Sequence, residues 1–173
     1  MMQFLFRLYV KFIRPHTEDK LDKLFEKIHP TQSTLWDTYK HLPMPEFSKV
    51  IDGYKYTPDP FYGAVDYAFD NPNKFFDGLS YGQDCDNWSR IWWFYGIANG
   101  YTAHEIIVTT VNHVMKDAHV VCVLEKDDKY WMCDYKPYGA YDSVEQAVEG
   151  LPDHWTKYTD ENLIWEYYYG IRS

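Results

Sequence analysis

Residues 84–98 read DCDNWSRIWWFYGIA and carry a helical pattern. Its apolar side chains recur every three or four residues, which is the period of one face of an α-helix. The positions on that face are Cys85, Trp88, Ile91, Trp92, Tyr95 and Ala98. Asn99 and Gly100 follow directly and are typical of a helix C-terminus. We therefore predict a central helix that carries Cys85 in its first turn.

Three segments after this helix are predicted to be β-strands, because they are rich in β-branched and apolar residues. They cover residues 105–111, 118–125 and 129–135. Lys126, Asp127 and Asp128 form a turn between the last two, so these strands make a hairpin. A capping-box pattern at residues 143–146 predicts a short helix that ends near Gly150, and residues 162–169 are expected to form a final strand. Helices first and strands later indicate an α+β fold.

The N-terminal part of the chain is less regular in pattern. Residues 1–14 alternate like a strand but also carry a basic helical face, and the two readings stay open. Residues 17–28 form an amphipathic pattern with Thr17 as the N-cap of a helix. Several prolines interrupt residues 30–77, for which we predict irregular structure. Residues 1–173 are taken as one domain, with its core at about 75–140 and an extension over 1–74.

Composition limits the partners. The chain has 17 Lys and Arg against 26 Asp and Glu, and its formal net charge of −9 argues against nucleic acid as a partner. Three cysteines are too few and odd in number for a disulfide framework, so we expect free thiols and a cytoplasmic location. Arg7 and Lys11 interrupt the apolar opening, so we expect neither a signal peptide nor a membrane span. We expect residues 1–14 to pack in the core and not to contact a membrane surface.

The sequence lacks the common motifs for nucleotide and metal binding. No glycine-rich phosphate loop follows a predicted strand, so no nucleotide cofactor is expected. The chain contains neither C-x-x-C nor H-E-x-x-H, so no metal site is expected. We therefore predict an activity that needs no cofactor.

Cys85 is the first candidate for chemistry. The start of a helix presents unpaired N–H groups and the positive end of the helix dipole, and both favour a thiolate over a thiol. The same N–H groups can stabilise an oxyanion that forms when the sulfur attacks an amide carbon. The alternative is a cysteine that simply packs in the core.

The hairpin supplies the other two candidates. A turn centred on Asp127 and Asp128 pairs Cys122 with Cys133 and Val121 with Asp134. In this register His119 and Asp134 share a face and lie diagonally opposite, within side-chain reach. A three-residue loop would shift the register by one and separate them. An imidazole oriented by a carboxylate can accept a thiol proton, so Cys85, His119 and Asp134 form a candidate catalytic triad.

A family resemblance adds to this reading. Residues 82–88, Gly-Gln-Asp-Cys-Asp-Asn-Trp, resemble the G-D-C-E-D-Y type sequence around the nucleophile of bacterial transglutaminase-like cysteine peptidases. Residues 118–121 resemble the histidine strand of that family, and residues 130–134 resemble its aspartate strand. The resemblance covers about residues 75–140. It differs at Gln83, where the family often has Gly, and at Asn87, which replaces an acid.

The resemblance implies a papain-like, transglutaminase-like core in which a helix bearing the cysteine packs on an antiparallel sheet. It implies acyl transfer on amide or isopeptide bonds of a protein or peptide through a thioester. Hydrolysis, deamidation and amine transfer all stay open, because water and amines compete for the same thioester. Gln83, Tyr81 and the Cys85 amide are the candidate oxyanion donors, and Trp88 is a candidate substrate contact.

Two other functions and several other residues are alternatives to the enzyme with the Cys85, His119 and Asp134 triad. One is an inactive transglutaminase-like module that binds a peptide or protein in an aromatic cleft, and another is a surface interaction protein that uses its basic N-terminal segment. His113 is a second candidate base, but it lacks a carboxylate in matching register, and His104 is spare. Cys122 and Cys133 are expected to pack as small apolar residues on the other face of the hairpin.

Overall fold

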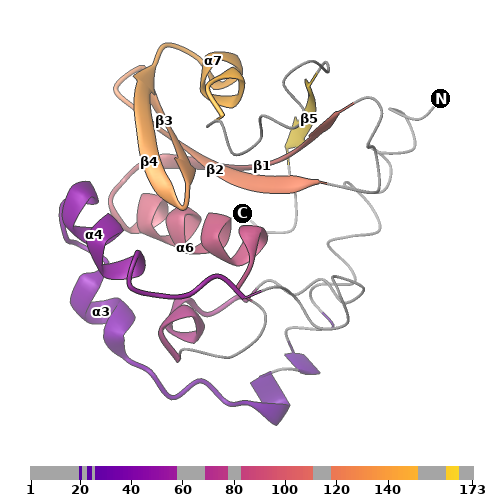
Figure 1. Cartoon of the computed structure of the whole chain (residues 1–173). Coiled ribbons are helices and arrows are strands. Elements are labelled where there is room, and N and C mark those ends of the chain that lie inside the picture. Colours follow the sequence, from indigo (N-terminus) through magenta and orange to yellow (C-terminus); the bar gives the residue numbers. More distant parts are fainter. Residues whose placement is uncertain are drawn as a thin grey trace.

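The computed structural model describes residues 20, 23–24, 26–57, 69–77, 83–110, 118–151 and 163–167. Within these ranges, helices lie on both faces of one antiparallel sheet (Figure 1). The helices are α3 (Leu35–Tyr39), α4 (Met44–Ile51), the 3₁₀-helix η2 (Pro72–Asp77), α6 (Cys85–Ala98) and α7 (Val144–Glu149). The strands are β1 (Thr102–Thr110), β2 (His119–Lys126), β3 (Lys129–Asp134), β4 (Lys136–Tyr141) and β5 (Leu163–Tyr167). The predicted α+β class is confirmed.

The central helix α6 follows its sequence pattern closely. It begins at Cys85 and ends at Ala98. The Asn99 amide donates to the carbonyls of Tyr95 and Gly96, and Gly100 follows with φ +71°. Glycine adopts this left-handed conformation without the steric penalty of a side chain. Local signals therefore determine both ends of α6.

The strands lie in the order β4-β3-β2-β1-β5, and all neighbours are antiparallel. The predicted hairpin is confirmed, because Cys122 pairs with Cys133 and Lys126 pairs with Lys129. The two loop residues, Asp127 and Asp128, have φ of 52° and 56°. Positive φ at both positions is characteristic of a type I′ turn, whose twist matches that of the strands it joins. The three-residue loop and its shifted register are thereby excluded.

The expectation of irregular structure over residues 30–77 was wrong for part of that range. Both α3 and α4 are regular helices, and η2 adds a 3₁₀ segment. Pro43 is the N-cap of α4 and Pro45 lies in its first turn. A proline there removes no intrahelical hydrogen bond and already has a helical φ, so it starts a helix instead of breaking one.

For β1, β4 and the helix predicted over residues 17–28, the structure agrees only partly with the sequence prediction. The strand β1 begins at Thr102, three residues before the predicted start. The strand β4 was not predicted, because it contains Pro137 and Gly139, which are depleted in strands. It lies at the edge of the sheet, where proline is tolerated. Of the helix predicted over residues 17–28, residues 20, 23–24 and 26–28 are described and are helical. Residues 1–14 lie outside the described residues.

The C-terminal elements lie where they were predicted. The Ser143 side chain accepts a hydrogen bond from the Gln146 amide over 3.2 Å at the start of α7. The Gln146 side chain in turn accepts from the Asp142 amide. This exchange satisfies amides that the helix itself cannot pair. The strand β5 falls within residues 162–169 and pairs with β1.

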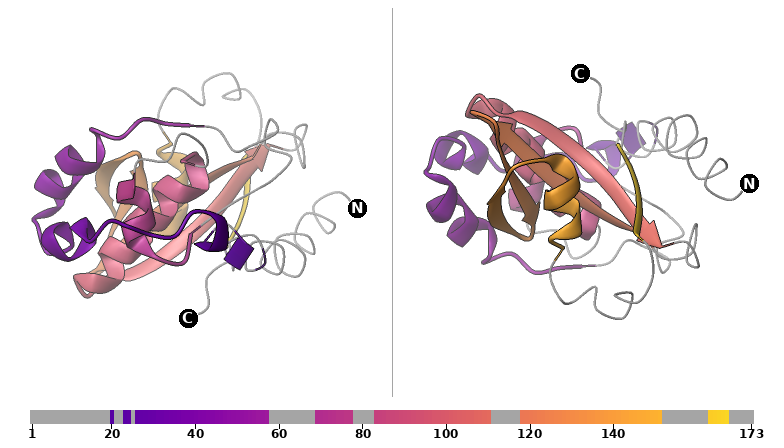
Figure 2. Two further views of the ribbon diagram at one scale, coloured as in Figure 1. Left: turned by 90° about the horizontal axis from the view of Figure 1, so that it is seen from below. Right: turned by 90° about the horizontal axis from the view of Figure 1, so that it is seen from above.

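The two faces of the sheet are covered by different helices. The core between α6 and the sheet contains Cys122, Leu124 and Cys133 together with the aromatic residues of α6. The core beneath α7 contains alternate residues of the same strands, Val121, Val123 and Met132 among them. In Figure 1, α6 lies below the sheet and α7 above it, and the view from above in Figure 2 shows α7 crossing the sheet.

The helices α3 and α4 pack against α6. Trp36 of α3 and Phe47 of α4 are buried in the same core as α6, and the Phe47 ring stacks on Tyr95 at 4.4 Å between ring centroids. The Tyr95 hydroxyl donates to the Leu42 carbonyl over 2.9 Å. Trp36, Phe47 and Ile51 therefore belong to the same hydrophobic core as α6.

A buried ion pair joins α6 to β1. Arg90 Nε lies 3.2 Å from Glu105 Oε1, and both side chains are 1% exposed. Arg90 also donates to the Phe69 carbonyl and lies near Asp70. Such a pair fixes the helix against the strand, because either charge alone would be strongly disfavoured in the core.

Replacement of Glu105 by Gln should therefore destabilise the protein by about 3 kcal/mol, since it removes the buried counter-charge of Arg90 and leaves only the exposed carboxylate of Asp70 nearby. Urea unfolding of the purified variant measures this change. The matched control is Asp142→Asn, which breaks the exposed Lys129–Asp142 pair and should change stability by less than about 0.5 kcal/mol. Equal effects of the two variants would contradict the proposed importance of the buried pair.

Stability should fall at alkaline pH. Burial raises the pKa of the Cys122 and Cys133 thiols, and it raises the pKa of Tyr95 to about 12. Above pH about 8.5 the unfolded chain releases thiol protons that the folded chain keeps, so the free energy of unfolding decreases as pH rises. Urea midpoints at pH 7, 9 and 10 test this, and Cys122→Val should flatten the curve. A midpoint that stays constant from pH 7 to 10 would contradict the expectation.

Within the described residues, no helix is both long enough and apolar enough to span a membrane.

Candidate active site

The three residues of the predicted triad lie at the ends of three elements. Cys85 is the first residue of α6, His119 the first residue of β2 and Asp134 the last residue of β3. The first hydrogen bond of α6 runs from Trp88 N to Asp84 O over 3.0 Å. The amides of residues 85–87 therefore precede the intrahelical hydrogen bonds. Together with the helix dipole they favour negative charge at this end of α6.

His119 and Asp134 form a direct hydrogen bond. His119 Nε2 lies 2.7 Å from Asp134 Oδ1, and their side chains are only 8% and 1% exposed. An ionised carboxylate only accepts hydrogen bonds, so Nε2 carries the proton in this pair. In the neutral ring Nδ1 is then the basic nitrogen. The contact therefore sets the tautomer and anchors the Nε2 side of the imidazole.

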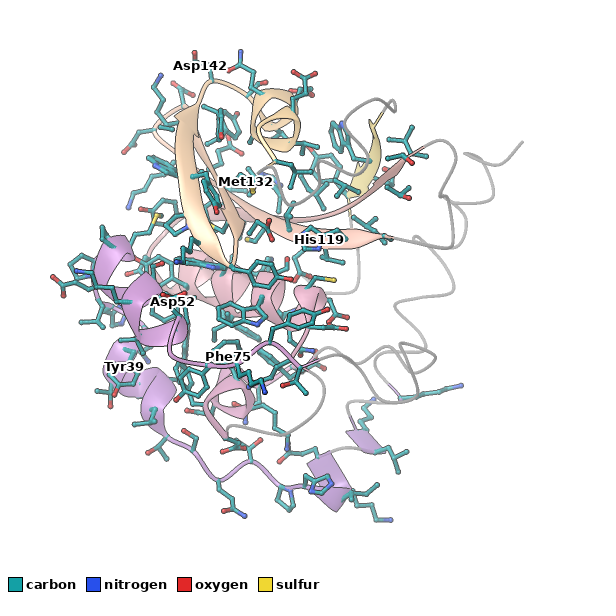
Figure 3. All side chains as sticks on the ribbon, viewed as in Figure 1. Tyr39, Asp52, Phe75, His119, Met132 and Asp142 are labelled. Atoms are coloured by element: carbon teal, nitrogen blue, oxygen red, sulfur yellow. The ribbon has the colours of Figure 1, made fainter. Side chains whose placement is uncertain are left out.

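His119 and Asp134 lie at one end of the sheet, where their strands begin and end. By strict alternation, His119 and Asp134 would share the α7 face with Val121 and Met132, whereas α6 covers the opposite face. Both residues are terminal in their strands, however, and in Figure 3 His119 lies above the end of α6 that begins with Cys85. The candidate site is therefore formed where two strand ends meet a helix start.

The ring of Tyr135 contacts both α6 and His119. Its ring centroid lies 5.3 Å from that of Trp88 in α6 and 6.0 Å from that of His119. Its carbonyl accepts a hydrogen bond from Trp92 Nε1 over 3.4 Å. Its φ is +57°, a conformation that costs a residue with a side chain roughly 1–2 kcal/mol. No sequence signal indicates this role, since the left-handed region favours glycine and asparagine over tyrosine.

The electrostatics of Tyr135 place Cys85 in the same neighbourhood. Burial raises the pKa of the Tyr135 hydroxyl well above its usual range, and the charges of Cys85 and Asp134 raise it further. Coulomb interactions weaken with distance, so the two groups lie near one hydroxyl. The pKa of the Tyr135 hydroxyl therefore responds to the charges of both Cys85 and Asp134.

The remaining predicted site residues have different surroundings. Gln83 forms a two-way backbone bridge with Thr57, and its side chain donates to the Phe75 carbonyl over 2.6 Å. This pairing fixes the segment that leads into Cys85 and uses the Gln83 backbone N–H and one of its side-chain N–H groups. Tyr81, the other predicted oxyanion donor outside α6, lies outside the described residues.

Trp88 is 4% exposed, and its indole packs against Phe75 and Tyr135. Its Nε1 is buried and has no hydrogen-bond partner within the described ranges. A side chain this buried offers little surface to a substrate. Trp88 therefore contributes to the site by supporting Tyr135.

The first half of α6 also buries polar side chains. Asp86, Asn87, Ser89 and Arg90 are each at most 1% exposed. Asn87 Nδ2 donates to Asp86 Oδ1 over 3.2 Å. Buried polar groups need partners, and here the Arg90–Glu105 ion pair and the Asn87–Asp86 hydrogen bond supply some of them. The sequence signal was present, because these polar residues interrupt an otherwise aromatic helix.

The other histidines and cysteines lie elsewhere. His104 Nε2 lies 2.9 Å from Glu125 Oε2, at the opposite end of β2 from His119. His113 lies outside the described residues. Cys122 and Cys133 are free, buried thiols in the core, as predicted. In the part of the chain that the structure describes, no cluster of three or more His, Cys, Asp or Glu side chains is placed to hold a metal ion.

No protein-family model matches the chain, and no curated protein gives a significant match. Solved structures that match it include LapG of Legionella pneumophila. An EGTA-treated LapG is 20% identical, and the match covers 68% of this chain and 69% of that chain with a TM-score of 0.41. Another LapG structure is 17% identical, with 75% of this chain and 91% of that chain covered and a TM-score of 0.41. At these values the similarity says nothing about activity, which has to be inferred from the side chains.

Proposed function

We propose that this chain is a cysteine-dependent enzyme that transfers the acyl group of an amide or isopeptide bond through a thioester. Cys85 is the nucleophile, His119 the general base and Asp134 the residue that orients it. The observation that carries the proposal is the buried 2.7 Å hydrogen bond between His119 Nε2 and Asp134 Oδ1. The short sequence resemblance to transglutaminase-like cysteine peptidases supports the same assignment.

In this proposal the Cys85 thiol gives its proton to His119 Nδ1, and the thiolate attacks the carbonyl carbon. Amides at the start of α6 stabilise the oxyanion. The imidazolium then protonates the leaving nitrogen, the C–N bond breaks and a thioester forms. Water or a second amine attacks the thioester while His119 takes its proton, and the acyl–sulfur bond breaks to restore Cys85.

The proposed substrate is a protein or peptide, since these molecules supply amide and isopeptide bonds. The proposed compartment is the cytoplasm, because the three free cysteines suit a reducing environment. The choice between hydrolysis and amine transfer depends on which nucleophile reaches the thioester, and it is a question for experiment.

The first experiment uses p-nitrophenyl acetate, an activated ester that reports on acyl transfer without a known natural substrate. The parent should release p-nitrophenol over many turnovers, and mass spectrometry should find a transient acetyl group on Cys85. The variant Cys85→Ala should lose the turnover. Acetylation without turnover, or labelling spread equally over Cys122 and Cys133, would contradict the proposal and favour an inactive binding module.

The second experiment separates the two reaction types. Glycine methyl ester or hydroxylamine is added to the same reaction, and acetylated amine is quantified against free acetate. An amine product that saturates at millimolar amine concentration would assign the chain as an acyltransferase. Acetate as the main product throughout would assign it as a hydrolase.

A further inference from the structure

The residue that follows Asp134 adopts a backbone conformation that its side chain does not favour. Among the described residues, Asp127, Asp128 and Tyr135 are the non-glycine residues with positive φ. The two aspartates form the hairpin turn, where short polar residues accept this conformation. Tyr135 is bulky and has no such reason. A strained conformation persists when the surrounding contacts impose it, and it is a recognised feature of functional sites.

The contacts that hold Tyr135 come from each part of the candidate site. Its carbonyl accepts from Trp92 Nε1, and its ring packs against Trp88, so α6 holds it at two points. Its neighbours Asp134 and Lys136 pair with each other across β3 and β4, which confines the backbone to a tight connection. On the other side the ring reaches His119.

We infer that Tyr135 is a positioning residue, whose ring, held by its left-handed backbone between α6 and β2, keeps the His119 imidazole on Asp134 and directed at Cys85. This inference rests on the proposed function and names a residue that the family motif does not include. Asp134 holds one ring nitrogen of His119, and packing against the ring face limits how far the imidazole tilts about that contact.

Two substitutions at Tyr135 distinguish the effect of the ring from the effects of the hydroxyl and of the backbone conformation. Tyr135→Phe keeps the ring and the strained φ but removes the hydroxyl. Tyr135→Asn removes the ring and suits the left-handed backbone, so it should fold, and Tyr135→Gly serves the same purpose if it does not. The rate of Cys85 alkylation by iodoacetamide is measured from pH 5 to 9, together with thermal unfolding and the NMR signal of the His119 Nε2 proton.

We expect Tyr135→Phe to label within about twofold of the parent at every pH. Tyr135→Asn should instead show the steep pH profile of a thiol without an imidazole partner, with labelling at pH 6 about five- to tenfold slower, and it should lose the slowly exchanging Nε2 proton signal. A profile that Tyr135→Asn and Tyr135→Gly leave unchanged would overturn the inference. A steep profile in Tyr135→Phe would also overturn it, because the hydroxyl and not the ring would then be responsible.

Failure of the proposed function gives a different result. In that case the parent already labels with the steep profile, and His119→Ala changes nothing. The Nε2 proton signal is then still informative, since it reports the His119–Asp134 contact without any activity. Loss of that signal in Tyr135→Asn and its retention in Tyr135→Phe would support the positioning role by itself, and equal signals would refute it.

Discussion

Replacement of His119 by Ala should change the pH dependence of Cys85 alkylation from nearly flat to steep. In the proposed Cys85–His119 pair the sulfur is a thiolate, so the rate in the parent should vary by less than about threefold between pH 6 and 8. In the variant the thiolate fraction should rise about tenfold per pH unit below the ordinary thiol pKa of about 8.5. Iodoacetamide labelling with mass spectrometry of the Cys85 peptide measures both curves.

The slope of the curve is more informative than the rate at one pH. At pH 6 the thiolate fraction in the variant should fall by a factor of several hundred, on the order of 10². A more basic thiolate is also more nucleophilic, with a Brønsted slope of about 0.4–0.5, and this offsets most of the loss. The net decrease at pH 6 is therefore only about five- to tenfold, whereas the change in slope is unambiguous.

The chain offers a matched control in His104. It also contacts a carboxylate, Glu125 Oε2 at 2.9 Å, but it lies in β1, opposite Val123 and away from the His119 end of β2. His104→Ala should leave the Cys85 profile flat. Cys122 and Cys133 should react far more slowly than Cys85 in every folded variant, because both are fully buried and burial raises their pKa. A steep profile in the parent, or a flat one in His119→Ala, would refute the Cys85–His119 pair.

The second large effect is expected at Asp134. Asp134→Ala removes the acceptor of the His119 Nε2 proton, so the imidazole should lose both its orientation and its tautomer. Turnover of p-nitrophenyl acetate should fall by about 10²-fold or more. Asp134→Asn should lose less than about tenfold, because an amide oxygen can accept the same proton, as in Cys-His-Asn triads. Steady-state rates of the two variants test this order.

Glu125→Gln is the control for this experiment, since it changes the carboxylate partner of His104 and should leave turnover unchanged. A circular dichroism melt of each variant separates lost activity from lost structure, because the buried Nε2 proton left by Asp134→Ala itself costs about 1–3 kcal/mol. Asp134→Asn as inactive as Asp134→Ala would mean that the negative charge matters. Full activity in Asp134→Ala would remove Asp134 from the proposed triad.

The sequence by itself determined the elements that depend on local interactions. The apolar period and the Asn99–Gly100 stop set the bounds of α6, and they place Cys85 at its first position. The two aspartates set a two-residue loop, which determines the hairpin register and thereby the contact of His119 with Asp134. These features follow from side-chain spacing and from turn geometry over a few residues, so no distant part of the chain is needed to predict them.

Only the tertiary structure decided the rest. The helices α3 and α4 and the edge strand β4 depend on partners far away in the chain, and the prolines of α4 and β4 suggest irregularity when read locally. Packing also decided that α6 covers the Cys122 face of the sheet, so that the candidate site lies at the end of the sheet. The left-handed Tyr135 is the clearest case, because its own preference opposes the conformation that Trp88, Trp92 and the β3–β4 connection impose on it.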